Sequence, residues 1–494
     1  MTRKLFIGAA LLIAIIAWLP AGAGAQNNAA SVIASASKAM AADNLTSITY
    51  SGSAQNANFG QSKNIGTPWA PTGITRITTY TRTIDLNQPA SRAFGPTMPP
   101  AVPGAAAPMP GNFNQNITPA QMGWTQQLEI WITPWGFLKG AAANNATVRR
   151  ANGRNVVSWS PAMKAPSGQP YTVTGYINDQ NLVEKVETRV EHPILGDLLV
   201  EAEYSNYQDL GGLKVPGRIV QRRAGLQTFE ASITGARANP ANLTELMTPP
   251  PPPGRAGGAG APAAAQGPPT PPPVETQKLA EGVYKITGGY VALAVDMGDH
   301  IVVVEGPQNQ ERGQAVINAA KAAIPNKPIR FVVNTHPHFD HASGLAPFVA
   351  EGVTILTHEN NEDFLEEALG ARRALVGDAL AKANRRPNVE GVGDRRTLRG
   401  GNRTIDLYHV RGLEHNDGML IAYLPNEKIL HTADFGIPNP GAAPAPVNPS
   451  LIKLVENLDR LKLDFTTFVT VHPPVPDRPL TRADLMGAVG KGTN

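Results

Sequence analysis

The chain has 494 residues, of which 42% are hydrophobic and 17% are charged, and its formal net charge is +4. At roughly 150 residues per domain this length predicts two or three domains, and the hydrophobic fraction excludes a wholly disordered chain. The small net charge is not the signature of a nucleic-acid-binding protein. The complete absence of Cys excludes disulfides, iron–sulfur clusters and thiolate nucleophiles, so any metal must be held by His and carboxylate side chains.

The N-terminus has the pattern of a secretory signal peptide. Basic residues precede an apolar run over 5–19, and the small residues of Ala23–Ala25 form an A-x-A cleavage site. The run is shorter than the roughly 20 residues that span a bilayer, which disfavours a permanent transmembrane anchor. We therefore expect residues 1–25 to be removed and the protein to be exported, periplasmic or secreted, without stable membrane insertion.

Residues 27–246 are predicted to form a mainly antiparallel β domain. A short Ala-rich helix over 29–42 comes first, and the Pro-rich stretch 88–119 is typical of a long loop. Apolar and polar residues alternate in a β-like way over 74–84, 127–138, 156–160, 171–177, 184–191, 198–207 and 218–223. No cluster of His, Asp or Glu occurs here, and the domain's one histidine, His192, is expected at the surface or in a turn.

The run YSNYQDLGGLKVPGRIV, over Tyr204–Val220, contains a strand, a turn and a second strand. It resembles the corresponding part of periplasmic lipoprotein-carrier and related half-barrel domains, over few residues. This resemblance implies a lipoprotein-carrier-like half-barrel for 27–246. It also implies an alternative function, in which the chain is a periplasmic carrier of a lipophilic ligand and the second domain is secondary.

A Pro- and Gly-rich segment divides the chain in two. Residues 249–273 contain 11 Pro and 5 Gly with one charged residue. Such a composition cannot bury enough apolar surface to offset its ordering entropy, which predicts an extended, semi-rigid linker over 247–275.

Residues 276–494 alternate between strand and helix patterns, which predicts an α/β domain of layered sheet and helices. The strands are expected at 283–286, 290–295, 301–304, 331–334, 353–356, 404–410, 419–424, 428–432 and 466–471. Helices are expected over 309–324 and 451–461, with another after the strand at 353–356.

The chemistry is concentrated in one string, His336-Pro337-His338-Phe339-Asp340-His341, directly after the apolar strand at 331–334. Residues 336, 338 and 340 of an extended chain project to the same side, so His336 and His338 can hold one cation together. Asp340 and His341, where the chain turns towards a helix, can reach a second cation. Imidazole and carboxylate are the ligands that zinc takes when thiolate is absent.

This string is the signature of the metallo-β-lactamase superfamily, which the chain resembles over Leu279–His472. The resemblance implies a four-layered αβ/βα sandwich with a dinuclear metal site at one edge of its two sheets. It also implies a third His for the first metal, a bridging Asp or Cys, and a last His for the second metal. His415 in GLEHNDG, Asp434 in LHTADF and His472 in VTVHPP match these three places.

Two other residues compete for the third His position. His409 lies inside a predicted strand and is expected to be packed, and Asp417 is a more distant candidate. The remaining histidines, His300, His358 and His431, match no ligand position and are expected to be structural.

The implied site holds two Zn²⁺, with iron or manganese as alternatives. His336, His338 and His415 bind one metal, Asp340, His341 and His472 bind the other, and Asp434 lies between them. Two dications beside one water would lower its pKa from about 15.7 towards roughly 7 and supply a bridging hydroxide. Asp340 would orient this nucleophile and pass a proton to the leaving group.

One departure from the superfamily pattern concerns the support of the ligands. Glu305-Gly306 stands where the superfamily commonly has Asp-x-Gly, which is expected to affect outer-shell support rather than metal binding. The group that holds the second nitrogen of His336 is not identifiable from the sequence.

The substrate class follows partly by exclusion. Asp434 stands where two β-lactamase subclasses have Cys, and the segment 437–449 after it contains no Arg or Lys. We therefore expect an exported dinuclear zinc hydrolase that acts on a small neutral carbonyl substrate, namely an ester, lactone, thioester or amide. Besides the carrier protein, the alternative is a mononuclear iron oxygenase of the persulfide-dioxygenase type on the same fold.

Overall fold

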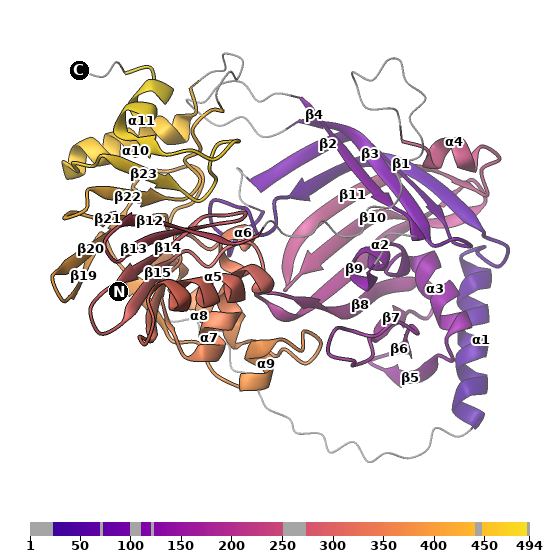
Figure 1. The fold of residues 1–494 in the computed structure, drawn as a ribbon. Coiled ribbons are helices and arrows are strands. Elements are labelled where there is room, and N and C mark those ends of the chain that lie inside the picture. The colour runs from indigo at the N-terminus through magenta and orange to yellow at the C-terminus, as the bar shows by residue number, and fades with distance from the viewer. Residues whose placement is uncertain are drawn as a thin grey trace, which may run out of the picture.

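The computed structural model describes residues 23–69, 73–98, 110–119, 123–249, 273–439 and 447–491. One large sheet lies before the predicted linker and two smaller sheets lie after it, each packed against helices (Figure 1). Most of the predicted signal peptide and residues 250–272 of the predicted linker lie outside the described residues.

The N-terminal domain is built on an eleven-stranded antiparallel sheet in the order β4-β3-β2-β1-β11-β10-β9-β8-β7-β6-β5. The strands are β1 (Ser47–Ala57), β2 (Ile74–Asp85), β3 (Ala90–Met98), β4 (Gly111–Ile117), β5 (Thr147–Ala151), β6 (Arg154–Trp159), β7 (Val173–Ile177), β8 (Val183–His192), β9 (Gly196–Leu210), β10 (Leu213–Arg223) and β11 (Leu226–Ala238). The helices are α1 (Ala23–Ala39), α2 (Trp124–Trp131), α3 (Pro134–Ala143) and α4 (Leu243–Met247). The curved sheet packs with α2 and α3 into one apolar core that includes Tyr80, Trp135 and Phe137 (Figure 1).

The strand predicted over 127–138 is wrong, because this stretch forms α2 and α3. Leu128, Ile130 and Ile132 are all buried, and this alternation imitates the period of a strand although the helices are enclosed on several sides. Thr133 and Pro134 mark the true boundary. The Thr133 hydroxyl accepts the N–H of Gly136 at 3.1 Å as an N-cap, and Pro134 begins the helix.

The long loop predicted over 88–119 is also wrong, because it contains β3 and β4. β4 is an edge strand whose side chains are mostly exposed, so its sequence, GNFNQNI, has no apolar alternation. Its strand conformation comes from its pairing with β3, where Phe94 faces Asn114.

The C-terminal domain contains two sheets. The first has the order β12 (Glu275–Ala280), β13 (Val283–Thr287), β14 (Ala292–Asp296), β15 (Ile301–Val304), β16 (Ile329–Val333), β17 (Thr354–His358) and β18 (Val389–Val392), and is parallel from β15 onward. The second has the order β19 (Arg395–Gly400), β20 (Arg403–His409), β21 (Leu420–Leu424), β22 (Ile429–Thr432), β23 (Thr467–Thr470) and β24 (Leu480–Thr481), with β22 and β23 parallel.

These two sheets are the inner layers of a four-layered domain. Val304, Leu356 and Leu407 belong to an apolar core shared by the two sheets. Helices α5 (Gln310–Ala323), α6 (Phe339–Ala342), α7 (Leu345–Glu351), α8 (Glu359–Gly370) and α9 (Ala379–Ala383) accompany the first sheet, and α10 (Pro449–Leu461) and α11 (Arg482–Ala488) accompany the second. The order of layers is therefore αβ/βα.

At the contact between the two domains, each domain inserts one apolar side chain into the core of the other. Ile194, in the turn between β8 and β9, is fully buried in the core of the C-terminal domain. Leu375, between α8 and α9, packs into the core of the N-terminal domain. Buried Arg373 donates to the carbonyls of Pro193 at 2.7 Å and Ile194 at 3.1 Å, which fixes this turn against the C-terminal domain.

Candidate metal centre

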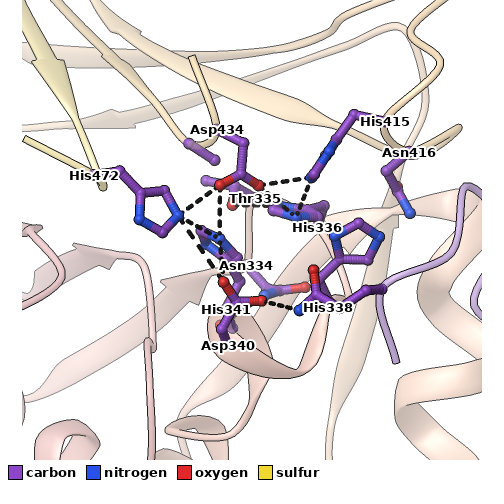
Figure 2. Close-up of polar contacts among 12 residues, drawn as sticks. Asn334, Thr335, His336, His338, Asp340, His341, His415, Asn416, Asp434 and His472 are labelled. Atoms are coloured by element: carbon purple, nitrogen blue, oxygen red, sulfur yellow. Dashed lines mark hydrogen bonds and ion pairs between the residues drawn. The ribbon is translucent and has the colours of Figure 1, made fainter. Parts of the chain in front are cut away.

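The seven residues predicted to bind metal meet at one end of the two inner sheets (Figure 2). The string that begins at His336 follows β16, and His415 lies in the connection between β20 and β21. Asp434 follows β22 and His472 follows β23, which are neighbouring parallel strands. Parallel strands present their carboxyl ends at the same edge of a sheet, so residues far apart in the sequence converge there.

The first group consists of His336, His338, His415 and Asp434, whose candidate ligand atoms all lie within 4.8 Å of one another. His336 Nε2 is 3.4 Å from His415 Nε2. Asp434 Oδ2 is 2.9 Å from His336 Nε2 and 2.8 Å from His415 Nε2. His336 and His338 are fully buried, whereas the His415 side chain is 31% exposed and leaves one side of the group open.

The second group consists of Asp340, His341 and His472. His341 Nε2 is 3.2 Å from His472 Nε2 and 3.4 Å from Asp340 Oδ2. The other oxygen of Asp434, Oδ1, is 3.2 Å from His341 Nε2 and 2.6 Å from His472 Nε2. The Asp434 carboxylate therefore faces both groups, with one oxygen towards each (Figure 2).

The donor atoms fit two divalent cations. In each group two imidazole nitrogens face each other at 3.2–3.4 Å, where their lone pairs repel unless a proton or a metal cation lies between them. Ligand atoms about 2.0–2.1 Å from a tetrahedral zinc ion are about 3.3–3.4 Å apart. The donor set of imidazole and carboxylate also suits zinc, iron or manganese.

Outer contacts fix two of the imidazoles. Glu305, at the end of β15, is fully buried, and its Oε2 accepts the Thr335 hydroxyl at 2.6 Å and lies 3.3 Å from His341 Nδ1. The Thr335 oxygen is 3.2 Å from His336 Nδ1 and, having donated its proton to Glu305, accepts from that nitrogen. The departure from Asp-x-Gly was expected to affect outer-shell support, but Glu305 provides that support here. The acceptor for the second nitrogen of His336 is Thr335.

Two further side chains are held by the N-terminal domain or by the start of the C-terminal domain. His338 Nε2 is 2.8 Å from the carbonyl oxygen of Ser62. Asp340 Oδ1 accepts from Gln61 Nε2 at 2.5 Å, and Asp340 Oδ2 accepts the Tyr290 hydroxyl at 3.0 Å. The ring of Tyr290 also packs edge-on against His472, with 4.3 Å between ring centroids.

The electrostatics of the cluster favour a cation. Burial raises the pKa of Asp434, but hydrogen bonds from four imidazoles lower it far below its usual range. Burial lowers the pKa of His341, but the Glu305 carboxylate and hydrogen bonds to two aspartates raise it well above its usual value. Burial also lowers the pKa of His336, and lowers that of His338 to about 4. The metal-free cluster therefore holds a proton at His341, which a bound metal ion would displace.

The competing histidines and Asp417 lie outside both groups. His409 Nε2 contacts the carbonyl oxygen of Asp417 at 2.9 Å, and the Asp417 side chain is half exposed beside Lys63. His358 caps α8, and His300 and His431 are buried and belong to neither ligand group. His192 was expected at the surface or in a turn, but it is the last residue of β8, and its ring packs against Phe339 of the other domain, with 4.6 Å between ring centroids.

Gln61, Tyr290 and Thr335 were not predicted as functional residues. The sequence offered a signal for Thr335, because this residue carries a hydroxyl and directly precedes the His string. Gln61 and Tyr290 lie 279 and 50 residues from Asp340, in segments without any motif. Only the tertiary fold brings these two side chains to the cluster.

Comparisons with known proteins find matches to parts of this chain. Residues 295–472 match the family model of the Metallo-beta-lactamase superfamily. A curated relative, 2,4-dinitroanisole O-demethylase subunit alpha of Nocardioides sp. (strain JS1661), is 26% identical over 160 residues. This match covers 32% of the present chain and 45% of the relative, which is less than half of its length.

Solved structures that match this chain include a metallo-beta-lactamase from Pontibacter korlensis, 19% identical, with a TM-score of 0.34 over 44% of this chain and 98% of that one. The FIM-1 metallo-beta-lactamase from Pseudomonas aeruginosa, in its mono-zinc form, is 17% identical, with a TM-score of 0.32 over 44% of this chain and 94% of that one. The predicted fold class, an αβ/βα sandwich preceded by a mainly antiparallel β domain, is confirmed.

Proposed function

The C-terminal domain has the metallo-β-lactamase fold, and from this premise we propose that the chain is a dinuclear zinc-dependent hydrolase of small carbonyl substrates. The observation that carries the proposal is the position of the Asp434 carboxylate. Its two oxygens face two separate groups of ligand atoms. A mononuclear iron oxygenase needs only one such group. The second group, with its own facing pair of imidazole nitrogens, favours the dinuclear alternative.

In this proposal His336, His338 and His415 would hold the first ion, Asp340, His341 and His472 would hold the second, and Asp434 faces both ligand groups. Bound dications supply a water of lowered pKa and polarise the carbonyl oxygen of the substrate. Glu305 and Thr335 keep the two inner imidazoles in the tautomer that leaves Nε2 free for a metal.

Asp340 is the proposed group for orienting the nucleophilic water and moving its proton. Burial raises the pKa of Asp340, but hydrogen bonds from His341, Gln61 and Tyr290 outweigh this and hold the pKa well below its usual range. The carboxylate is therefore ionised at neutral pH and accepts hydrogen bonds at Oδ1 and Oδ2. Burial and the Asp340 carboxylate raise the pKa of Tyr290, so that its hydroxyl stays protonated as a donor.

The carrier alternative has less support. The core of the N-terminal domain is filled with large side chains, including Trp135 and Phe137, where a lipoprotein-carrier fold would hold its ligand. An open groove of about 380 Å³ between α1 and α3 is lined mainly by Ala and Leu side chains. However, these two helices lie on the side of the N-terminal domain away from α6, which carries Asp340 and His341 (Figure 1).

Export to the periplasm or the medium is proposed from the N-terminal pattern. Among the described residues no helix is long and apolar enough to cross a membrane. The proposed cut after Ala25 falls in the first turn of α1. Mass spectrometry of the protein from its native host would then find Gln26 as the first residue, and an intact N-terminus would contradict export by cleavage.

The catalytic proposal is tested by hydrolysis assays on the zinc-loaded full chain. The panel comprises an ester, a lactone, a thioester, an amide, a β-lactam and a phosphodiester, with 2,4-dinitroanisole added because of the curated relative. We expect hydrolysis of at least one carbonyl substrate, its loss with a chelator, and its recovery with Zn²⁺. The variant His336→Ala should be inactive, whereas His300→Ala, outside the cluster, should retain activity. Turnover that persists in His336→Ala and without metal would overturn the proposal.

A further inference from the structure

A segment of the N-terminal domain lies across the metal cluster of the other domain. This segment, Asn58–Lys63, directly follows β1 and is called the β1 extension below. We propose that the β1 extension is part of the metal centre, because it sets the tautomer of His338 and the orientation of Asp340, and that Gln61 is a positioning residue for metal binding. The inference rests on the proposed metal site and adds a role for the first domain.

The contact with His338 determines which nitrogen is free. A carbonyl oxygen only accepts hydrogen bonds, so the 2.8 Å contact with Ser62 requires His338 Nε2 to carry a proton and donate it. In a neutral imidazole that donates from Nε2, the lone pair lies on Nδ1. Nδ1 is buried and has no hydrogen-bond partner among the described residues, which leaves it as the ligand atom.

The contact with Asp340 determines which oxygen is free. Gln61 Nε2 donates to Oδ1 at 2.5 Å, while Oδ2 faces His341 Nε2 at 3.4 Å. The amide thus holds the carboxylate so that Oδ2 points into the second ligand group. Without Gln61, Oδ1 would lose this contact, and the side chain would be held only at Oδ2, by the Tyr290 hydroxyl and His341 Nε2.

The β1 extension is anchored to both ligand loops, so its contacts are built into the fold. On the side of the His string, Gly60 accepts the N–H of Phe339 at 3.0 Å, and the ring of Phe59 packs edge-on against the Phe339 ring at 5.4 Å. Gly60 has φ +83°, and a Cβ there would lie 2.1 Å from the Phe339 ring, so this close approach requires glycine.

On the side of His415, the carbonyl of Lys63 accepts the N–H of Asp417 at 3.0 Å and the side-chain amide of Asn416 at 3.1 Å. The Lys63 ammonium also pairs with Glu414 at 3.1 Å. One short piece of the N-terminal domain therefore connects the loop that carries His338 and Asp340 to the loop that carries His415. The geometry of the metal centre depends on both domains.

The test is zinc affinity of the full chain, measured by competition with a chromophoric chelator. Outer-shell partners of metal ligands typically contribute about 10–100-fold to affinity, so Gln61→Ala should weaken zinc binding at one of the two ions by about that factor. Gln61→Glu has the same shape but places an acceptor and a charge against Asp340, so it should be at least as weak. Gly60→Ala should displace the whole extension and weaken binding of both ions.

The matched control is Gln180→Ala, because Gln180 is exposed in the turn at the opposite end of β8 from His192. It should bind zinc as the unaltered chain does. The visible absorption bands of the Co²⁺-loaded protein should change in the Gln61 variants and stay the same in the control, since they report ligand geometry, with circular dichroism unchanged throughout.

The outcomes separate the two proposals. Tight binding of two ions by the unaltered chain, with equal affinity and spectra in Gln61→Ala and Gly60→Ala, would overturn this inference and leave the hydrolase proposal intact. Less than one ion bound by the unaltered chain would overturn both.

Discussion

At the scale of single residues, Glu305 contacts both a ligand histidine and the hydroxyl beside another one. Its carboxylate is fully buried and holds both Thr335 and His341, and its backbone has φ +86°, an unusual value for a residue other than glycine. A strained backbone conformation that points a buried carboxylate at groups of a candidate metal site is typical of a functional residue.

We predict that Glu305→Gln lowers zinc affinity by about 10–100-fold, because the neutral amide no longer stabilises the protonated Nδ1 of His341. Chelator competition measures the change, and Glu366→Gln, on the exposed side of α8, is the control. Equal affinity in Glu305→Gln and the unaltered chain would show that Glu305 has no role in metal binding.

The residues of the candidate site divide into predictable and unpredictable ones. His336, His338, Asp340 and His341 form a contiguous string, and their spacing is enough to indicate a shared cation. The choice of His415 over His409 depended on one residue lying in a loop and the other in a strand, and the structure places only His415 in the cluster. Gln61 and Tyr290 have no local signal, since their roles exist only through long-range contacts.

At the scale of elements, the N-terminal domain depends on the boundary between α2 and α3. The Thr133 hydroxyl caps α3 and also donates to the carbonyl of Ile130 at 2.6 Å, and the residue is buried. We predict that Thr133→Ala lowers the free energy of unfolding by about 1–2 kcal/mol, because the backbone N–H of Gly136 then has no side-chain acceptor. Urea unfolding measures this loss.

Thr133→Ser is the informative comparison, because serine keeps the hydroxyl and removes only a methyl group. It should recover most of the lost stability. A serine variant as unstable as the alanine variant would mean that packing of the methyl group, and not the cap, holds the two helices.

The elements that were predicted correctly are those whose environment imposes a simple period. α5 has Val316 and Ala320 on one buried face, β15 is a continuous apolar run, and β16 is apolar after its exposed Arg330. The errors have opposite causes. The stretch 127–138 is too buried for a helical period to be visible, and β4 is too exposed for a strand period to be visible.

At the scale of the whole molecule, the domains form a continuous structure around the metal cluster. Ile194 and Leu375 are exchanged between the two cores, and His192 packs its ring against Phe339, next to Asp340. His192 Nδ1 accepts the N–H groups of Ile194 at 3.2 Å and Leu195 at 3.1 Å, so a neutral imidazole shapes the docking turn.

This interface predicts a pH dependence. Burial, together with the charges of Arg223 and Arg373, lowers the pKa of His192 to about 3, against about 6.5 in the unfolded chain. As the pH falls from about 6.5 towards 3, the unfolded chain binds a proton at this position that the folded chain does not, so stability falls with pH. One such group contributes up to about 1.4 kcal/mol per pH unit.

We predict that His192→Asn, whose Oδ1 can accept the same two N–H groups and does not titrate, loses stability less steeply between pH 6.5 and pH 4.5. Urea unfolding of both proteins at several pH values gives the two slopes. Other buried histidines titrate equally in both proteins, so the difference isolates His192. Identical slopes would show that His192 is not held neutral in the folded protein.

The central claim is that Asp434 lies between two metal ions. Anomalous X-ray diffraction at the zinc edge, from crystals of the zinc-loaded full chain, tests it most directly. We predict two anomalous peaks, one beside Nε2 of His336 and His415 and Nδ1 of His338, and one beside Asp340, His341 and His472, with one Asp434 oxygen towards each. A single peak, or peaks away from Asp434, would contradict the claim.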